Sequence, residues 1–216
     1  QVGSDMLDRL NDDDEEIRLY GVSMLSYAHD GRAVDALAGA LGDMSVRVKA
    51  AAAEALGRIG RPASQAITAC LEDATDIGDF ETARFAAKAA GLVRSSEALA
   101  PLLEALSCED SMLAGEAALA LGQLGDERAR PDLVDALVRP DANVRFTSAQ
   151  ALGELGDPRA IPSLEACLRE DEDEGVRAKA QWAVSHIRRS SQMSRSSRST
   201  GSLSSEPYTG SSEVLR

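Results

Sequence analysis

The chain has 216 residues, which is enough for one ordinary domain or for one stack of small repeats. Its formal net charge of −13 makes nucleic acid a poor partner, because phosphate backbones are bound through clusters of lysine and arginine. No apolar run approaches the roughly 20 residues that a membrane-spanning helix needs. We therefore expect no membrane partner, and a cytoplasmic location.

One sequence pattern recurs along the chain and predicts a repeat architecture. It consists of an acidic or hydroxyl residue, an aliphatic–basic pair, and a run of small residues that ends in Ala-Leu-Gly. The residues that close this run are spaced 31, 34, 31, 31 and 32 apart: Ser26, Gly57, Gly91, Gly122, Gly153 and Ser185. Such regular spacing is typical of stacked helical repeats. We place the three-residue insertion behind the spacing of 34 in the turn at 73–79.

Each repeat is expected to contain a first helix, A, and a second helix, B. The B helices follow residues whose side chains can accept hydrogen bonds from a first helical turn: Asp14, Ser45, Asp110, Asp141 and Asp173. The A helices are shorter, for example at 98–106, 129–137 and 160–168. Pro131 and Pro162 lie near two A-helix starts, where a missing backbone N–H has little effect.

The stretch Gly-Asp-Pro-Arg-Ala-Ile-Pro at 156–162, preceded by Asp-x-x-Val-Arg through Ala-Leu-Gly at 141–153, resembles the short HEAT repeat of the phycobilisome-lyase type. The resemblance covers residues 1 to about 189. It implies an all-α fold, a right-handed α-α superhelix of about six helix pairs, with A helices on the convex side and B helices on the concave side. The expected repeats are 1–30, 31–61, 62–94, 95–125, 126–156 and 157–189.

Three repeats depart from the pattern. Repeat four has Ala114 where the others carry a basic residue, and repeat one has Ser26 in place of glycine. In repeat three the motif is shifted by about one position, so Arg84 fills the basic position only approximately. Deviation is expected in repeats that cap a stack.

Residues 190–216 contain 11 serines and few large apolar side chains, so we expect a disordered, Ser-rich tail. It is either an extension without a role or a phosphorylatable or partner-binding segment around Tyr208.

We expect no catalytic residues, no cofactor and no metal site. Enzymes that resemble deoxyhypusine hydroxylase carry paired His-Glu dipeptides, whereas neither His29 nor His186 is followed by glutamate. Cys70, Cys108 and Cys167 have no metal-binding spacing. The acidic runs at 12–16 and 170–174 precede B helices, where negative charge complements the helix dipole.

The basic residues Arg18, Lys49, Arg145 and Arg177 recur at one position of the motif, which indicates a structural role. We expect them to pair with turn carboxylates, such as those of Asp14, Asp141 and Asp173, within or between repeats.

The function expected is that of an adaptor or scaffold, a monomer when alone, that binds another protein through the concave face. A place in prokaryotic signalling or complex assembly is one possibility that the resemblance leaves open. The alternative is an enzyme or enzyme subunit resembling bilin lyases, which hold a tetrapyrrole and its acceptor protein. The motif register places these side chains on the concave face: Tyr20, Tyr27, Glu54, Arg58, Phe85, Lys88, Glu116, Gln123, Gln150, Glu154, Lys179, Trp182 and His186.

Overall fold

The structure, a computed structural model, describes residues 4–28 and 30–200. Within these residues it contains α-helices and short 3-10 turns and no strand, so the all-α prediction is confirmed. The A helices are α1 (Ser4–Asp8), α3 (Gly31–Gly39), α5 (Ser64–Asp76), α7 (Leu99–Ser107), α9 (Arg130–Ala136) and α11 (Ile161–Glu170). The B helices are α2 (Glu15–Leu25), α4 (Val46–Ile59), α6 (Phe80–Val93), α8 (Ser111–Leu124), α10 (Ala142–Leu155) and α12 (Glu174–Thr200).

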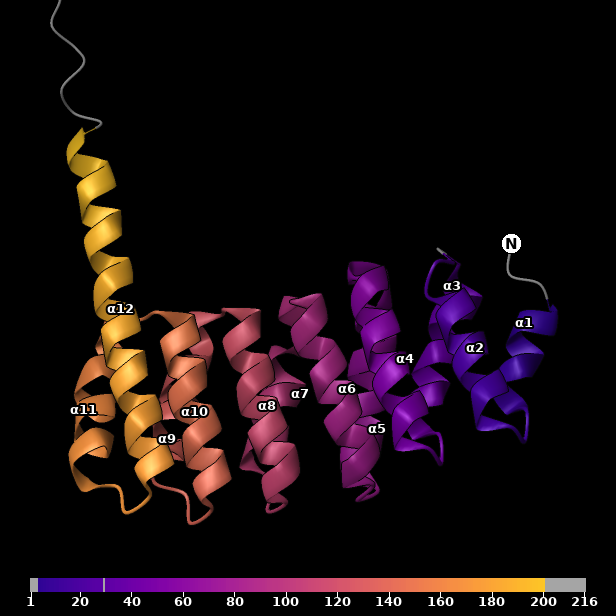
Figure 1. The fold of residues 1–216 in the computed structure, drawn as a ribbon, viewed down its shortest axis with the longest axis horizontal. Coiled ribbons are helices and arrows are strands. Elements are labelled where there is room, and N and C mark those ends of the chain that lie inside the picture. Colours follow the sequence, from indigo (N-terminus) through magenta and orange to yellow (C-terminus); the bar gives the residue numbers. More distant parts are fainter. Residues whose placement is uncertain (1–3, 29, 201–216) are drawn as a thin grey trace, which may run out of the picture.

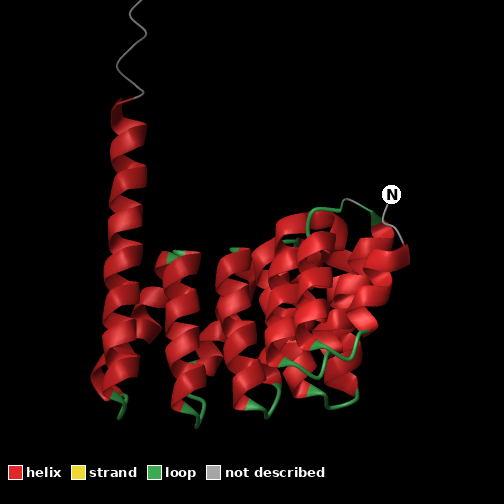
Figure 2. Cartoon of the chain, turned by 45° about the vertical axis from the view of Figure 1, so that its right-hand side comes forward, coloured by secondary structure: helices red, strands yellow, loops and turns green. Residues whose placement is uncertain are grey.

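The helix pairs stack side by side in chain order, with the B helices forming one layer and the A helices the other (Figure 1). The loops lie at the ends of the helices (Figure 2). Because each pair packs against the next, the molecule is a solenoid with two long helical faces. The six repeat boundaries expected from the sequence stay a prediction.

The predicted N-caps of the B helices are confirmed. Asp14 accepts a hydrogen bond from the backbone N–H of Glu16 at 2.8 Å, and Asp110 accepts one from Leu113 at 2.8 Å. Ser45, Asp141 and Asp173 cap α4, α10 and α12 in the same way. These side chains satisfy backbone donors that have no partner within the helix. Local sequence therefore sets where most B helices begin.

Small residues allow the B helices to approach closely. A Cβ atom added at Gly122 would lie 2.7 Å from the Cα atom of Ala151 on the next B helix. At Gly91 the corresponding distance to the Cα atom of Ala120 would be 2.8 Å. Real Cβ atoms do not come this near, so glycine is required at these two positions of the B–B junctions. The largest of the fully buried side chains are mostly leucines, such as Leu121.

The insertion in repeat three is accommodated differently from our prediction. Helix α5 continues to Asp76, and only residues 77–79 form the turn before α6. The backbone N–H groups of Ile77 and Asp79 bond to the carbonyl oxygens of Asp73 and Ala74 and close the helix. The extra residues lengthen α5, because residues 73–76 contain no glycine or proline that would end it.

The last helix also differs from the prediction. Helix α12 continues to Thr200 and extends well beyond the stack (Figure 1), so a disordered tail from residue 190 is wrong for 190–200. No glycine or proline occurs between Gly175 and Gly201, and nothing local stops the helix. The rest of the expected tail, with Tyr208, lies outside the described residues, as does His29. No helix of the described chain is long and apolar enough to cross a membrane.

Candidate protein-binding face

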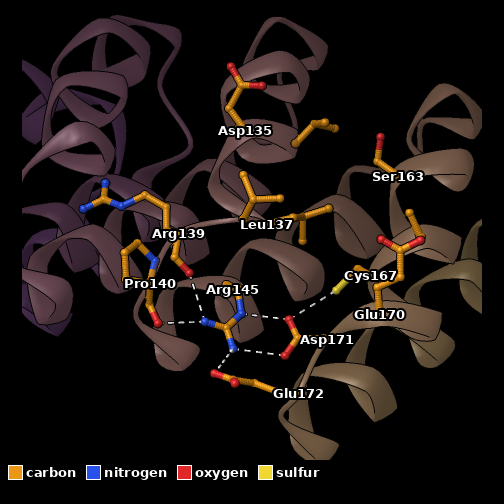
Figure 3. Close-up of a pocket in the computed structure, with 13 residues that line it drawn as sticks. Asp135, Leu137, Arg139, Pro140, Arg145, Ser163, Cys167, Glu170, Asp171 and Glu172 are labelled. Atoms are coloured by element: carbon orange, nitrogen blue, oxygen red, sulfur yellow. Dashed lines mark hydrogen bonds and ion pairs between the residues drawn. The ribbon is translucent and has the colours of Figure 1, made fainter.

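A buried ion pair joins the last two repeats. The guanidinium group of Arg145 on α10 donates hydrogen bonds to both carboxylate oxygens of Asp171, at 2.7 and 3.0 Å (Figure 3). Its third nitrogen bonds to the backbone carbonyl oxygens of Arg139 and Pro140. Both side chains of the pair are less than a tenth exposed. The hydrogen bond from Arg145 holds the pKa of Asp171 below its usual value, so the pair is ionised at neutral pH.

The same arrangement joins the first two repeats. Arg18 donates to both carboxylate oxygens of Asp43, at 2.8 and 3.1 Å, and to the carbonyl oxygens of Asp12 and Asp13. We call this geometry the inter-repeat clasp. An arginine on a B helix bonds to two carbonyl oxygens in the turn before that helix and to an aspartate in the corresponding turn of the next repeat. At these two junctions, the basic residue of the motif therefore holds neighbouring repeats together.

The other two basic residues make different or partial contacts at the same motif position. Lys49 bonds to Glu81 of the next B helix at 2.6 Å. Arg177 donates to the carbonyl oxygens of Asp171 and Glu172, as a clasp arginine does. The predicted structural role of the basic series is therefore supported.

The carboxylates that we named as partners for this series were wrong. Asp14, Asp141 and Asp173 cap their helices. The ion pairs are made instead by Asp43 and Asp171, each of which lies two residues before a cap.

Repeat four, which lacks the basic residue at Ala114, is held from the other side. Arg139 reaches back from the next turn and donates to the carbonyl oxygens of Leu106 and Cys108, at 2.7 and 2.6 Å. Arg139 lies two residues before a cap, where the first and last junctions have Asp43 and Asp171. At the junction between repeats four and five, the arginine therefore comes from the later repeat. It still bonds to carbonyl oxygens of the turn before the B helix, here those of Leu106 and Cys108.

A hollow of about 610 Å³ lies between α9 and α11 on the A-helix side (Figure 3). Arg145 and Asp171 line it together with Leu137 and Cys167. Burial, followed by the charge of Asp171, raises the pKa of the Cys167 thiol to about 11. The thiol is protonated at neutral pH and is a poor nucleophile. The hollow thus contains a structural ion pair and an unreactive cysteine.

The side chains predicted for the binding face lie on the B helices with different exposures. Six are exposed: Tyr20, Tyr27, Glu54, Arg58, Glu154 and Trp182. Six are half-buried: Lys88, Glu116, Gln123, Gln150, Lys179 and His186. Phe85 is only 7% exposed, so it belongs to the core and its assignment to the face is corrected. The ring of Phe85 is covered by the guanidinium group of Arg84, 5.1 Å from its centroid.

The aromatic residues of the face gather near the two ends of the stack. Trp182 on α12 stacks on His186, with ring centroids 5.2 Å apart, and Lys179 lies 5.0 Å from the Trp182 ring centroid. A Cβ atom at Gly153 would lie 2.5 Å from the Trp182 ring, so this side chain also covers the last junction. At the other end Tyr20 and Tyr27 are 52% and 76% exposed.

The middle of the face is polar. Lys88 pairs with Glu54 at 3.6 Å, and Gln150 donates to Glu154 at 2.9 Å. Burial raises the pKa of Glu116, an effect that nearby Lys88 partly opposes. The face is therefore apolar near its ends and carries charges of both signs between them.

Two exposed residues of this side were absent from the predicted set. Met112 at the start of α8 is 54% exposed. Arg94 follows α6 and has a backbone φ of 55°. A sequence signal for Arg94 existed, because the residues three positions after Gly57, Gly122 and Gly153 are all glycine.

Comparison with known proteins agrees with this architecture. The family model of HEAT repeats matches residues 4–79, 74–141 and 106–185. The CpcE–CpcF complex of phycocyanin lyase from Nostoc sp. PCC7120 is similar, with 24% identity and a TM-score of 0.55, covering 83% of this chain and 75% of that chain. No curated protein matches the sequence.

Two further structures share the fold. A designed armadillo repeat protein in complex with the peptide (KR)4 has 20% identity and a TM-score of 0.55, covering 85% of this chain and 98% of that one. A structure concerned with microtubule plus-end tracking by XMAP215, CLIP-170 and EB1 has 20% identity and a TM-score of 0.58, covering 84% and 89%. At these identities the likeness concerns the fold.

Proposed function

Because the chain belongs to the HEAT repeat family, we propose that it is a non-catalytic scaffold that binds another protein through its B-helix face. The observation that carries this proposal is the exposure of Tyr20, Tyr27 and Trp182 on that face. Large aromatic side chains are enriched at the energetic centres of protein interfaces.

The clasp strengthens the proposal, because it distinguishes residues that hold the repeats together from exposed residues that could contact a partner. Arg18 and Arg145 are buried in ion pairs that hold neighbouring repeats together. In contrast, Tyr20 and Tyr27 project from α2 and its C-terminal turn while remaining more than half exposed. The clasps do not use these two side chains, so a role in binding is the better explanation for their exposure.

The similar structures give the proposal a precedent. One of them is a designed armadillo repeat protein with a bound peptide, and another is the complex of CpcE with CpcF of phycocyanin lyase. Peptide or protein binding along a helical face is a common use of stacked repeats, because the face is long and its side chains vary independently of the core. Prokaryotic signalling or complex assembly, in the cytoplasm, stays the narrower form of this proposal.

The alternative, a lyase-like protein that holds a tetrapyrrole, needs an apolar groove on the binding face. A hollow of about 510 Å³ on this side is lined largely by polar residues, among them Arg94, Gln123, Glu154 and His186. Such a lining suits polar groups of a protein better than an extended apolar chromophore. The geometry therefore favours the scaffold.

The proposal is tested by affinity capture from native lysate, followed by mass spectrometry. The face variant combines Tyr20→Ala, Tyr27→Ala and Trp182→Ala. The matched control combines Met44→Ala, Ile77→Ala and Val138→Ala, which are apolar residues exposed by 89%, 78% and 85% in the turns between A and B helices. Thermal unfolding of both variants establishes that they remain folded.

We expect a stoichiometric protein that the wild type and the control capture and that the folded face variant loses. Equal capture by the face variant and the wild type would contradict the use of this face. A coloured small molecule without any protein would instead support the lyase-like alternative.

A further inference from the structure

The turns that follow the B helices share one backbone feature with one exception. Gly60, Gly125 and Gly156 each lie three residues after a closing glycine and have φ angles of 76°, 73° and 73°. The matching residue after α6 is Arg94, with φ 55° and ψ 40°. Arg94 is the one residue other than glycine with positive φ in the described chain. A left-handed backbone is unfavourable for side chains that carry a Cβ atom, so Arg94 is strained where its counterparts are not.

Arg94 is part of a group of cations at the ends of α4 and α6. We define the basic edge as Arg58, Arg61, Leu92 and Arg94, all of which are exposed. Leu92 lies directly over Gly57 and is 42% exposed. None of the three arginines forms an ion pair with a described residue, including Glu97 in the same turn as Arg94. The basic edge thus combines three unpaired guanidinium groups with one apolar side chain.

The same edge of the solenoid has the opposite charge pattern further along the chain. The position after the left-handed residue is Asp126 where repeat four meets repeat five, and Asp157 where repeat five meets repeat six. Each aspartate accepts hydrogen bonds from an arginine of its own turn, Arg128 and Arg159 respectively. At the end of repeat two the same position is occupied by Arg61. The later turns of this edge therefore contain Asp–Arg ion pairs, whereas the earlier turn contains arginine without an ion-pair partner among the described residues.

A hollow of about 350 Å³ lies between these two parts of the edge. Arg61, Arg94 and Ser96 line it together with Asp126 and Glu127. The acidic residues are already engaged, since Asp126 pairs with Arg128 at 2.6 Å and Glu127 with Arg159 at 2.8 Å. The guanidinium groups therefore face a hollow whose carboxylates have other partners.

Helix dipoles explain only part of this arrangement. A cation in the last turn of a helix is favourable, which accounts for Arg58 on α4 without any ligand. It does not account for Arg94, because glycine occupies that position after α4, α8 and α10 without strain. An observed backbone outlier that presents a charged group to a hollow is a reason to look for function there.

We propose that the basic edge binds an acidic segment of the partner protein, with the guanidinium groups of Arg61 and Arg94 contacting its carboxylates and Leu92 an apolar side chain. This inference rests on the proposed scaffold function, because it names the chemistry of the partner. Arginine suits this role, since its planar group donates two parallel hydrogen bonds to one carboxylate. The basic edge thus allows a chain of overall negative charge to bind an acidic partner.

The test uses fluorescence anisotropy with a short labelled peptide of alternating glutamate and leucine, and the same peptide with glutamine as its control. The variants are Arg94→Gly and Arg61→Gln. Arg169→Gln on the A-helix side makes the same change in net charge at an exposed residue and serves as the matched control. Thermal unfolding is measured for each protein.

We expect the glutamate peptide to bind, the glutamine peptide to bind much more weakly, and each edge variant to lose about tenfold in affinity. Arg94→Gly should melt at the same or a higher temperature, because it removes the left-handed arginine. A lower melting temperature would mean that Arg94 serves the fold, and would overturn its assignment. Equal binding of both peptides, or unchanged binding by both edge variants, would overturn the proposal for the whole edge.

These outcomes are separable from the test of the scaffold function. A partner that depends on Tyr20, Tyr27 and Trp182, together with no binding of the glutamate peptide, would leave the scaffold standing and remove only the basic edge. The absence of any captured protein would contradict the scaffold itself. The peptide experiment involves no cellular partner, so its result would not change that conclusion.

Discussion

Arg145 and Asp171 form a two-point ion pair across the junction between the last two repeats, with nitrogen–oxygen distances of 2.7 and 3.0 Å. Arg18 and Asp43 repeat the arrangement across the first junction. In both, the arginine also bonds to the carbonyl oxygens five and six residues before it. The clasp therefore fixes the position of one repeat's turn against the next repeat's turn.

Replacing Arg145 with alanine should lower the free energy of unfolding by about 3 kcal/mol, because the buried carboxylate of Asp171 loses its counter-charge. Urea unfolding followed by circular dichroism measures this loss. Arg47→Ala is the matched control, since Arg47 pairs with Glu16 while its side chain is 62% exposed. The control should lose less than about 1 kcal/mol. Similar losses in both variants would contradict a special role for the buried pair.

Acidification should weaken the same junction. The pKa of Asp171 is lowered in the folded chain, chiefly by the hydrogen bond from Arg145. A lowered folded pKa stabilises the protein above the unfolded value of about 3.9, and this contribution is lost as the pH falls through the folded pKa. Urea midpoints measured from neutral to acidic pH should therefore fall below about pH 4. Asp171→Asn should show a shallower fall, and an unchanged pH profile would refute the assignment.

Arg139 and Ala114 provide a test by transplantation. Ala114→Arg alone should destabilise the protein, because its guanidinium group would compete with Arg139 for the turn carbonyls near Cys108. The double variant Ala114→Arg, Arg139→Asp would rebuild the clasp of the first and last junctions. We expect it to be more stable than the sum of the single effects by about 1–3 kcal/mol. A double-mutant cycle by urea unfolding measures this coupling, and strict additivity would argue against the equivalence of the two arrangements.

The close approach of the B helices predicts opposite effects for two glycine substitutions. Gly122→Ala places a Cβ atom 2.7 Å from the Cα atom of Ala151, so we expect a loss of about 1–3 kcal/mol. Gly39→Ala at the end of α3 meets no atom within 4 Å and should stabilise by about 0.5–1 kcal/mol. Melting temperatures should therefore move in opposite directions. A shared direction would show that the junction can relax.

Several parts of the fold were predictable because their causes are local. Asp14 and Asp141 bond to N–H groups only two residues away, so a cap can be recognised from the residues beside it. The spacing of Gly57, Gly91, Gly122 and Gly153 indicated repeated helix pairs in the same way. The end of α12 was misjudged, because serine-rich composition indicated disorder whereas helix continues to Thr200.

The sequence predicted which helix positions belong to the candidate face better than it predicted how exposed their side chains are. Tyr20 and Trp182 are exposed on B helices. Phe85 occupies the same motif position as Tyr20 but is buried, because exposure also depends on the neighbouring helix. Arg94 was not predicted, although its position is glycine in three other repeats, because it lies in the turn after a B helix and outside the helical register that defines the face.

The sequence by itself determined the all-α class, the repeat spacing and the N-caps, because each depends on residues within one or two helical turns. Only the tertiary structure decided which carboxylates complete the clasps. Near the cap Asp173, for example, Asp171, Glu172 and Glu174 are all acidic. Asp43 and Asp171 are selected because their turns meet Arg18 and Arg145 across a repeat junction. Those partners are separated by 25 and 26 residues in the chain, so their pairing follows from how neighbouring repeats pack.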